Sequence, residues 1–180
     1  DGGWCKNENS LGLGDYIPKE DNFANYSLKA LADIIKEKGM IPGIWLELDA
    51  CNDTAFGFKP DEDWIIKRYD RAVGKNGRHF YNFSNKDVRA YLKGRIKELY
   101  DMGYRYIKND YNQSTGIGCT NNYDGNSPAE GIIQNNTAFV AFIDELYEEF
   151  PGLVIENCGA GGMREDNSML RHYALQSTSD

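Results

Sequence analysis

The sequence predicts an α/β fold, specifically a (β/α)8 TIM barrel of which this chain is an incomplete segment. Short apolar strand signals alternate with amphipathic helical patterns, which indicates parallel strands covered by helices. A complete barrel usually needs about 250 residues, whereas this chain has 180. The strand signals lie at 41–48, 104–110, 153–157 and 173–178, and the helical patterns lie at 27–38, 84–102, 127–150 and 163–171.

The first helical pattern leads directly into the first of these strands. Its apolar residues fall on one face of a helix, and Gly39 is a typical helix stop. The apolar run at 41–48, with a Pro42-Gly43 break near its start, is typical of a strand. The apolar helix face comprises Leu28, Leu31, Ile34 and Ile35.

Two longer helices begin at capping signals. Ser84-x-x-Asp87 resembles a capping box ahead of a helix that runs to about Met102. Ser127–Glu130 combines a capping box with proline at the first helical position, and Pro151 ends that second helix. Because each helix lies between two strand signals, both are predicted to be crossovers between parallel strands.

Composition limits the classes of function. The net charge is −8 and the isoelectric point about 4.8, so neither nucleic acid nor an anionic membrane is expected as the main partner. No apolar run approaches the ~20 residues that span a bilayer, and no signal peptide is visible. We therefore expect a cytoplasmic location in preference to secretion.

The four cysteines, Cys5, Cys51, Cys119 and Cys158, are widely spaced and form no CxxC pair. A zinc site is therefore not expected, and the thiols are predicted to be reduced and mostly buried. Pairing of Cys5 with Cys51 stays open for a secreted protein. No cofactor is predicted.

A candidate nucleophile follows the strand that begins at Tyr104. Side chains alternate along a strand, so Lys108, Asp110 and Asn112 share one face if the strand geometry continues. In parallel α/β proteins this carboxyl end is where active sites form. A lysine beside an aspartate favours the ionised carboxylate, which makes Asp110 a candidate nucleophile.

Two carboxylates that flank a sugar bond suffice for glycoside hydrolysis, and Asp110 has two candidate partners for such a pair. In retaining enzymes the two carboxyl groups lie about 5–5.5 Å apart, one acting as nucleophile and the other as general acid/base. Asp180 and Glu156 both follow or end predicted strands, so either is placed to converge on Asp110. From the residues alone, this choice stays open.

Six motifs occur in order and resemble those of the bacterial-type α-galactosidases of glycoside hydrolase family 36, the melibiase group. The resemblance covers essentially the whole chain. Its most specific part is Lys-x-Asp-x-Asn followed by Glu-x-Cys-x-x-Gly-Gly-x-Arg-x-Asp and Ser-Asp. The motifs are DGGW at 1–4, GIWLE at 43–47, GR at 77–78, KNDYN at 108–112, ENCGAGGMRED at 156–166 and STSD at 177–180.

The resemblance implies roles for individual residues. Asp110 matches the nucleophile and Asp180 the acid/base. Gly2 replaces the second of two adjacent aspartates that normally bind galactose hydroxyls. Asn109 stands where the family usually has tryptophan, and Leu48-Asp49 replaces the usual Pro-Glu. The predicted substrate-binding residues are Asp1, Trp4, Trp45, Arg78, Lys108, Asn112, Cys158 and Gly161.

The same resemblance implies the setting of the chain. Residues 1–180 are expected to form part of a single (β/α)8 catalytic domain, covering about strands two to six, with flanking β domains and the remaining strands absent. The expected function is that of a retaining exo-α-glycosidase, whose partner is an α-galactosyl oligosaccharide or glycoconjugate. A homo-oligomeric parent is compatible with this setting.

Three other functions stay open. An α-N-acetylgalactosaminidase is the runner-up, because Gly2 and the glycine-rich run at 159–162 leave room for a larger sugar. A carbohydrate-binding remnant without catalysis is another, although both Asp110 and Asp180 are retained. The third is a metal-dependent barrel enzyme with Asp110, Glu156 and Asp180 as ligands. Neither histidine lies in a motif.

Overall fold

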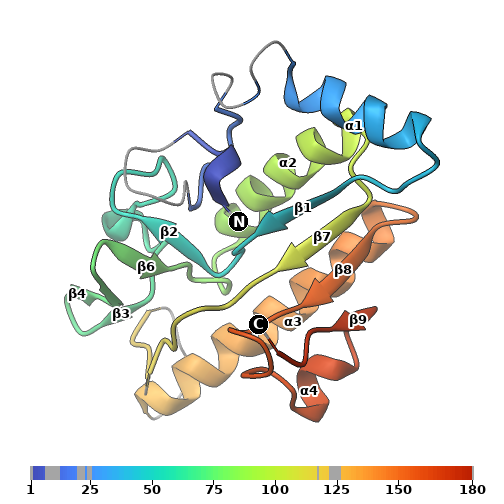
Figure 1. Ribbon diagram of the computed structural model, residues 1–180. Helices are drawn as coiled ribbons and strands as arrows, with labels where there is room; N and C mark the ends of the chain where they lie inside the picture. The colour runs from blue at the N-terminus through green and yellow to red at the C-terminus, as the bar shows by residue number, and fades with distance from the viewer. Residues whose placement is uncertain are drawn as a thin grey trace.

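The computed structural model describes residues 2–6, 13–19, 23, 26–116, 118–121 and 127–179. Its centre is a parallel four-stranded sheet in the order β1-β7-β8-β9 (Figure 1). The register aligns Trp45 with Lys108, and Lys108 with Glu156. The strands are β1 Gly43–Leu46, β7 Tyr106–Asn109, β8 Val154–Asn157 and β9 Leu175–Gln176.

Helices separate the parallel strands, as the alternating pattern predicts. Both long helices pack on one face of the sheet, where their apolar residues share a core with Ile107 and Ile155. That face is turned away from the viewer in Figure 1. The helices are α1 Leu28–Glu37, α2 Lys86–Met102, α3 Pro128–Glu149 and α4 Asn167–Leu170, with short 3-10 helices η1 Gly2–Trp4 and η3 Pro60–Glu62. None of the helices in the described part is long and apolar enough to span a membrane.

The helix starts largely follow the capping signals. Ser127 caps α3 by accepting from the N–H of Glu130, with Pro128 at the first helical position. For α2 the predicted cap is wrong by one residue. Asn85, not Ser84, accepts from the N–H of Asp87 at 2.9 Å. Asparagine caps helices as well as serine does, and so the box pattern misplaced the boundary.

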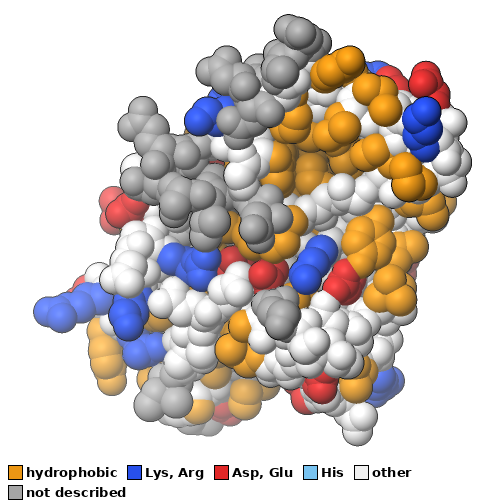
Figure 2. Space-filling model, in the orientation of Figure 1, with side chains coloured by type: hydrophobic (Ala, Val, Ile, Leu, Met, Phe, Trp, Pro, Cys, Tyr) orange, Lys and Arg blue, Asp and Glu red, His pale blue; other side chains and the backbone are white. Residues whose placement is uncertain are grey.

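The predicted apolar face of α1 is only partly buried. Leu28 and Ala32 enter the core, whereas Leu31 and Ile34 are each 37% exposed. The cause is position, because α1 lies beyond the β1 edge and contacts mainly α2 (Figure 1). Figure 2 shows the apolar side chains that result at this corner of the molecule.

An antiparallel excursion between β1 and α2 was not predicted. It consists of a three-stranded sheet and a two-stranded hairpin, with strands of two or three residues that are too short to display alternation. Its function in the fold is to bring Arg78 back toward the end of β1. The strands are β2 Ala50–Asn52, β3 Lys67–Arg68, β4 Arg71–Ala72, β5 Gly74–Lys75 and β6 Arg78–Phe80.

Candidate active site

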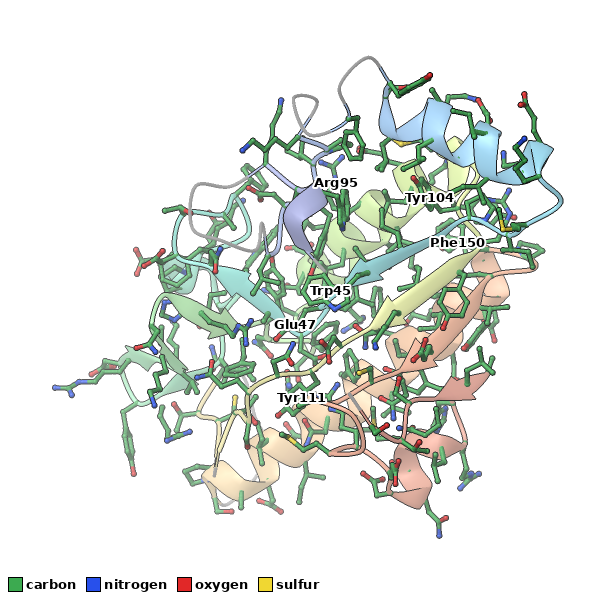
Figure 3. The ribbon with its side chains drawn as sticks, viewed as in Figure 1. Trp45, Glu47, Arg95, Tyr104, Tyr111 and Phe150 are labelled. Atoms are coloured by element: carbon green, nitrogen blue, oxygen red, sulfur yellow. The ribbon has the colours of Figure 1, made fainter. Side chains whose placement is uncertain are left out.

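Polar side chains converge where β1, β7 and β8 end. Figure 3 shows Trp45 on β1, Glu47 just beyond it and Tyr111 beyond β7 gathered at this end, while Tyr104 and Phe150 mark the opposite end. In Figure 2 the same face carries basic and acidic side chains over the middle of the sheet. Parallel strands bring the residues that follow them to one edge, so the convergence is a direct product of the topology.

Asp110 lies at the centre of this cluster and is 7% exposed. Its Oδ2 accepts hydrogen bonds from Asn112 Nδ2 at 2.8 Å and from Trp45 Nε1 at 3.2 Å. Its Oδ1 accepts from the N–H of Tyr111 at 2.8 Å and from the N–H of Ala160 at 3.3 Å. Both carboxylate oxygens are therefore held by fixed donors from three different loops or strands.

These donors control the ionisation of Asp110. Burial raises the pKa of the carboxyl group, but hydrogen bonds from Asn112, the Cys158 thiol, the Tyr111 N–H and Trp45 outweigh burial, so the pKa lies below its ordinary value. From the sequence, Lys108 was expected to favour the ionised carboxylate. Neutral donors are instead the main counterweight to burial. The outcome is the same, because Asp110 is ionised near neutral pH.

Glu47, the last residue of the GIWLE motif, is a site residue to which the sequence prediction gave no role. It is fully buried, pairs with Arg78 Nη2 at 3.2 Å, and accepts from Asn112 Nδ2 at 3.1 Å. Burial raises the pKa of Glu47, and Arg78 and Asn112 oppose that rise. The amide of Asn112 thus bridges two carboxylates. The alternation of Trp45 and Glu47 on one strand face was the available signal.

The segment after β8 lies against Asp110. Cys158 is fully buried, and the pKa of its thiol is raised by burial and by the hydrogen bond that it makes to Asp110. Gly161 has a φ of +79°, a conformation that glycine adopts without strain, and its carbonyl accepts from the N–H of Gly159 at 3.0 Å. The structure therefore brings both predicted residues into the turn beside Asp110.

Glu156 forms its hydrogen bonds with groups other than Asp110. Its two oxygens accept hydrogen bonds from the hydroxyls of Tyr106 and Ser177. It also aligns with Lys108 in the register of β7 and β8. Asp180, the other candidate acid/base, and Asp1 lie outside the described residues. Their predicted roles remain predictions.

Trp4 contacts the backbone of β1 at the site. Its Nε1 donates to the carbonyl of Trp45 at 3.0 Å, its ring stacks on Tyr16 with centroids 6.4 Å apart, and it is 9% exposed. The indole therefore fixes the backbone of β1 at Trp45. The predicted contact of Trp4 with substrate stays a prediction.

Two of the departures from the family pattern meet in space. Asn109 is fully buried, and its Oδ1 accepts from the N–H of Leu48 at 3.0 Å while its Nδ2 donates to Tyr173 Oη at 3.1 Å. A proline at 48 would have no N–H to donate, and a tryptophan at 109 would have no carbonyl to accept it. The two replacements therefore form one linked change.

Within the described ranges, no three side chains of His, Cys, Asp and Glu lie together as a metal site requires. The four cysteines are free and buried, including Cys5 and Cys51, so the structure contains no bond between that pair. His79 packs on Phe58 with ring centroids 4.4 Å apart, and His172 pairs with Asp144. The residues at this site are thus carboxylates with hydrogen-bond donors.

Comparisons with known proteins agree with this chemistry. The family described as Melibiase matches residues 1–180. The bifunctional alpha-galactosidase/sucrose kinase AgaSK of Mediterraneibacter gnavus is 29% identical over 180 residues, which cover 98% of this chain and 18% of that protein. The chain therefore spans about a fifth of the length of this relative.

Solved structures give the same picture. The GH36 alpha-galactosidase AgaB of Geobacillus stearothermophilus is 26% identical, with a TM-score of 0.79 over 93% of this chain and 23% of that one. A variant of AgaA from the same organism, in complex with stachyose, is 24% identical, with a TM-score of 0.83 over 100% of this chain and 26% of that one. The latter similarity shows the fold.

Proposed function

Because the chain belongs to the melibiase family, we propose that it carries the nucleophile and most of the sugar site of a retaining exo-α-galactosidase. The observation that carries this proposal is Asp110. It is a buried carboxylate at the carboxyl end of β7, with both oxygens hydrogen-bonded and its pKa lowered. An ionised, oriented carboxylate of this kind is what the first step of retaining hydrolysis requires.

The proposed reaction has two steps. Asp110 Oδ attacks the anomeric carbon of the terminal galactose, forming a covalent ester, while the bond to the aglycone oxygen breaks and that oxygen takes a proton from Asp180. The ionised Asp180 then removes a proton from water, whose oxygen attacks the anomeric carbon and releases Asp110. Configuration is retained because two displacements occur.

The residues around Asp110 supply sugar recognition in this proposal. Trp45 offers an aromatic surface beside the nucleophile, and Arg78 and Lys108 offer charged donors. Because the Nδ2 of Asn112 donates to both Asp110 and Glu47, its Oδ1 is the atom proposed to accept from a sugar hydroxyl. Cys158, Gly161, Asp1 and Trp4 complete the proposed sugar site.

The glycine run at 159–162, one of the two grounds for the N-acetylgalactosamine alternative, also has a role within its own loop. A Cβ on Gly159 would lie 3.2 Å from the backbone nitrogen of Arg164, and a Cβ on Gly162 would lie 2.8 Å from Glu165 Oε1. Gly159 is therefore constrained by backbone within its own loop, whereas the atom that a Cβ on Gly162 would meet is the end of a flexible glutamate side chain. The small size of Gly159 thus has a reason apart from the sugar pocket. Galactose remains the proposed sugar.

The chain is proposed to be a segment of a (β/α)8 barrel. The sheet order β1-β7-β8-β9, the helices on one face and the residues after the strands at one edge are the arrangement that such a segment has. An α-galactosyl oligosaccharide is the proposed substrate. Stachyose, bound in the AgaA variant, belongs to that class.

Azide rescue of Asp110→Gly tests the proposal in the full-length protein. The variant should lose hydrolysis of a nitrophenyl α-galactoside, because no carboxylate remains to form the ester. Added azide should restore turnover and yield β-galactosyl azide, since azide occupies the vacated space and attacks from the same face. Asp70→Gly, at the exposed tip of the β3–β4 hairpin, is the matched control and should keep full activity. Near-normal hydrolysis by Asp110→Gly would refute the assignment.

A further inference from the structure

Arg164 joins the segments that follow β1 and β8. Its Nη1 donates to Asp49 Oδ2 at 2.9 Å and its Nη2 to Asp49 Oδ1 at 2.7 Å, a bidentate pair of the strong kind. Asp49 is 7% exposed, and the two residues are 115 positions apart in sequence. The pair therefore fixes the loop after β8 to the loop after β1.

The same guanidinium group also holds the segment after β7. Its central carbon lies 3.4 Å from the ring centroid of Tyr111 and 5.0 Å from that of Phe139. Such stacking is favourable, more so when the groups are desolvated, and Tyr111 is 8% exposed. Tyr111 directly follows Asp110 and donates its N–H to Asp110 Oδ1 at 2.8 Å.

The loop that ends at Arg164 supplies a second donor in a strained conformation. Ala160 has a φ of +42°, which is unfavourable for a residue with a side chain, and such residues persist only where their surroundings hold them. Its N–H donates to Asp110 Oδ1 at 3.3 Å. The N–H of Met163 bonds to the carbonyl of Gly159, and Asn157 Nδ2 donates to the carbonyl of Arg164, so the loop is closed at its Arg164 end.

We propose that Arg164, held by Asp49, is a positioning residue for the nucleophile: it locks the three loops so that the N–H groups of Tyr111 and Ala160 stay directed at Asp110. This inference rests on the proposed role of Asp110. Arg164 donates to Asp49 and acts on Asp110 through the loops, and neither Arg164 nor Asp49 has a part in the proposed mechanism.

Arg164→Lys in the full-length protein tests the inference, because lysine keeps the charge but loses the bidentate geometry and the planar stack. We expect kcat to fall about 10–100-fold, since small misplacements of reacting groups have effects of that order. We also expect the acid limb of kcat/KM to move to higher pH. Weakened donors raise the pKa of Asp110, and that limb reports the free enzyme. Within the described part of the chain, the other titratable groups near Asp110 are Lys108 on β7, the adjacent Tyr111, Cys158 after β8 and, through Asn112, Glu47 after β1.

Arg105→Lys is the matched control. Arg105 also stacks on a tyrosine, with its guanidinium carbon 3.5 Å from the Tyr100 ring centroid, and bonds to backbone carbonyls. It precedes β7 and so lies at the opposite end of the sheet. A lowered Tm without any movement of the acid limb is expected for it. The same result for Arg164→Lys would overturn the inference and leave Arg164 a purely structural residue.

Two further variants keep the test decisive. In the double variant Asp49→Glu with Arg164→Lys, the longer glutamate side chain compensates for the shorter lysine, so that an ion pair can form again. This variant should recover part of kcat and move the acid limb of kcat/KM part of the way back. If Arg164→Lys does not fold, the isosteric Asp49→Asn is read by the same two measurements, and an unchanged acid limb there counts against the inference.

Failure of the proposed function is recognised separately. It appears as absent α-galactosidase activity in the unmodified full-length protein. In that case the titration of Asp110, followed by ¹³C NMR of labelled aspartate carboxyls and assigned with Asp110→Asn, still tests the positioning role. A titration midpoint that is identical in unmodified protein and Arg164→Lys would refute it.

Discussion

The helix-covered face of the central sheet and its carboxyl rim are stabilised by different interactions. On the helix-facing side, fully buried apolar residues of β7, β8, α2 and α3 share one core, with Ile155, Leu92 and Leu146 among them. At the carboxyl rim of the sheet, Glu47 after β1 is fully buried and Asp110 after β7 is 7% exposed. Apolar burial is non-directional, whereas buried polar groups must each find partners.

This difference shows which region of the molecule depends on exact side-chain geometry. A core tolerates changes of shape if volume is kept. The rim does not, because each buried carboxylate depends on named donors: Asn112 and Arg78 for Glu47, and Arg164 for Asp49. We therefore expect core changes to reduce stability and rim changes to reduce activity.

The largest expected effect is the loss of activity from a change at the carboxyl rim, compared with the loss of stability from a change in the core. Asp110→Asn should abolish turnover, since an amide cannot form the glycosyl ester, while the free energy of unfolding near pH 7 falls only by the modest amount that the ionised carboxylate contributes. Leu146→Ala on α3 should lower the free energy of unfolding by about 2–5 kcal/mol through loss of packing and a cavity. It should leave the kcat of the folded protein unchanged. Both variants are compared by calorimetry and by nitrophenyl galactoside hydrolysis. Equal losses of stability from the two changes would erase the distinction between core and rim.

The next effect distinguishes the two candidate acids. Asp180→Ala should slow raffinose hydrolysis by about 10²–10⁴-fold, because its leaving group needs a proton. An activated aryl galactoside, whose leaving group needs little protonation, should be affected much less. Glu156 already accepts from Tyr106 and Ser177, so Glu156→Gln should affect both substrates alike. If the leaving-group dependence appears in Glu156→Gln instead, the two roles must be exchanged.

The elements of the parallel sheet were predictable from sequence because they repeat a pattern. The helix at 127–150 carries an N-cap serine, a proline and an apolar stripe, and the structure has α3 at Pro128–Glu149. By contrast, β2 to β6 were missed. Strands of two or three residues contain less than two periods of alternation, and their pairing is decided by contacts across the chain, such as Cys51 with His79.

The candidate site was predictable only in part. Asp110, Lys108 and Asn112 were found because they lie at alternate positions at the end of one predicted strand, whereas the hydrogen bonds from neutral donors that lower the pKa of Asp110 could not be predicted from that spacing. Glu47 and Arg164 could not be assigned roles from sequence. Their partners lie 31 residues away, at Arg78, and 115 residues away, at Asp49, and only the folded topology brings them together.

The smallest effect concerns two carboxylates of the rim that share one amide. Asn112 donates to both Asp110 and Glu47, yet their pKa values move in opposite directions. That of Asp110 lies below its ordinary value, because its donors outweigh burial. That of Glu47 lies above, because burial outweighs Arg78 and Asn112. Their contributions to stability must therefore depend on pH with opposite sign.

Asp110 stabilises the folded state above its unfolded pKa of about 3.9, and that stability is lost as pH falls through the lower folded value. Glu47 contributes stability below its unfolded pKa of about 4.3, which is lost as pH rises through the higher folded value. Urea unfolding from about pH 3 to pH 8 measures both. Asp110→Asn should flatten the acid side of the stability profile, and Glu47→Gln should flatten the decline above about pH 4. Flattening on the same side by both variants would show that the shared amide does not separate the two ionisations.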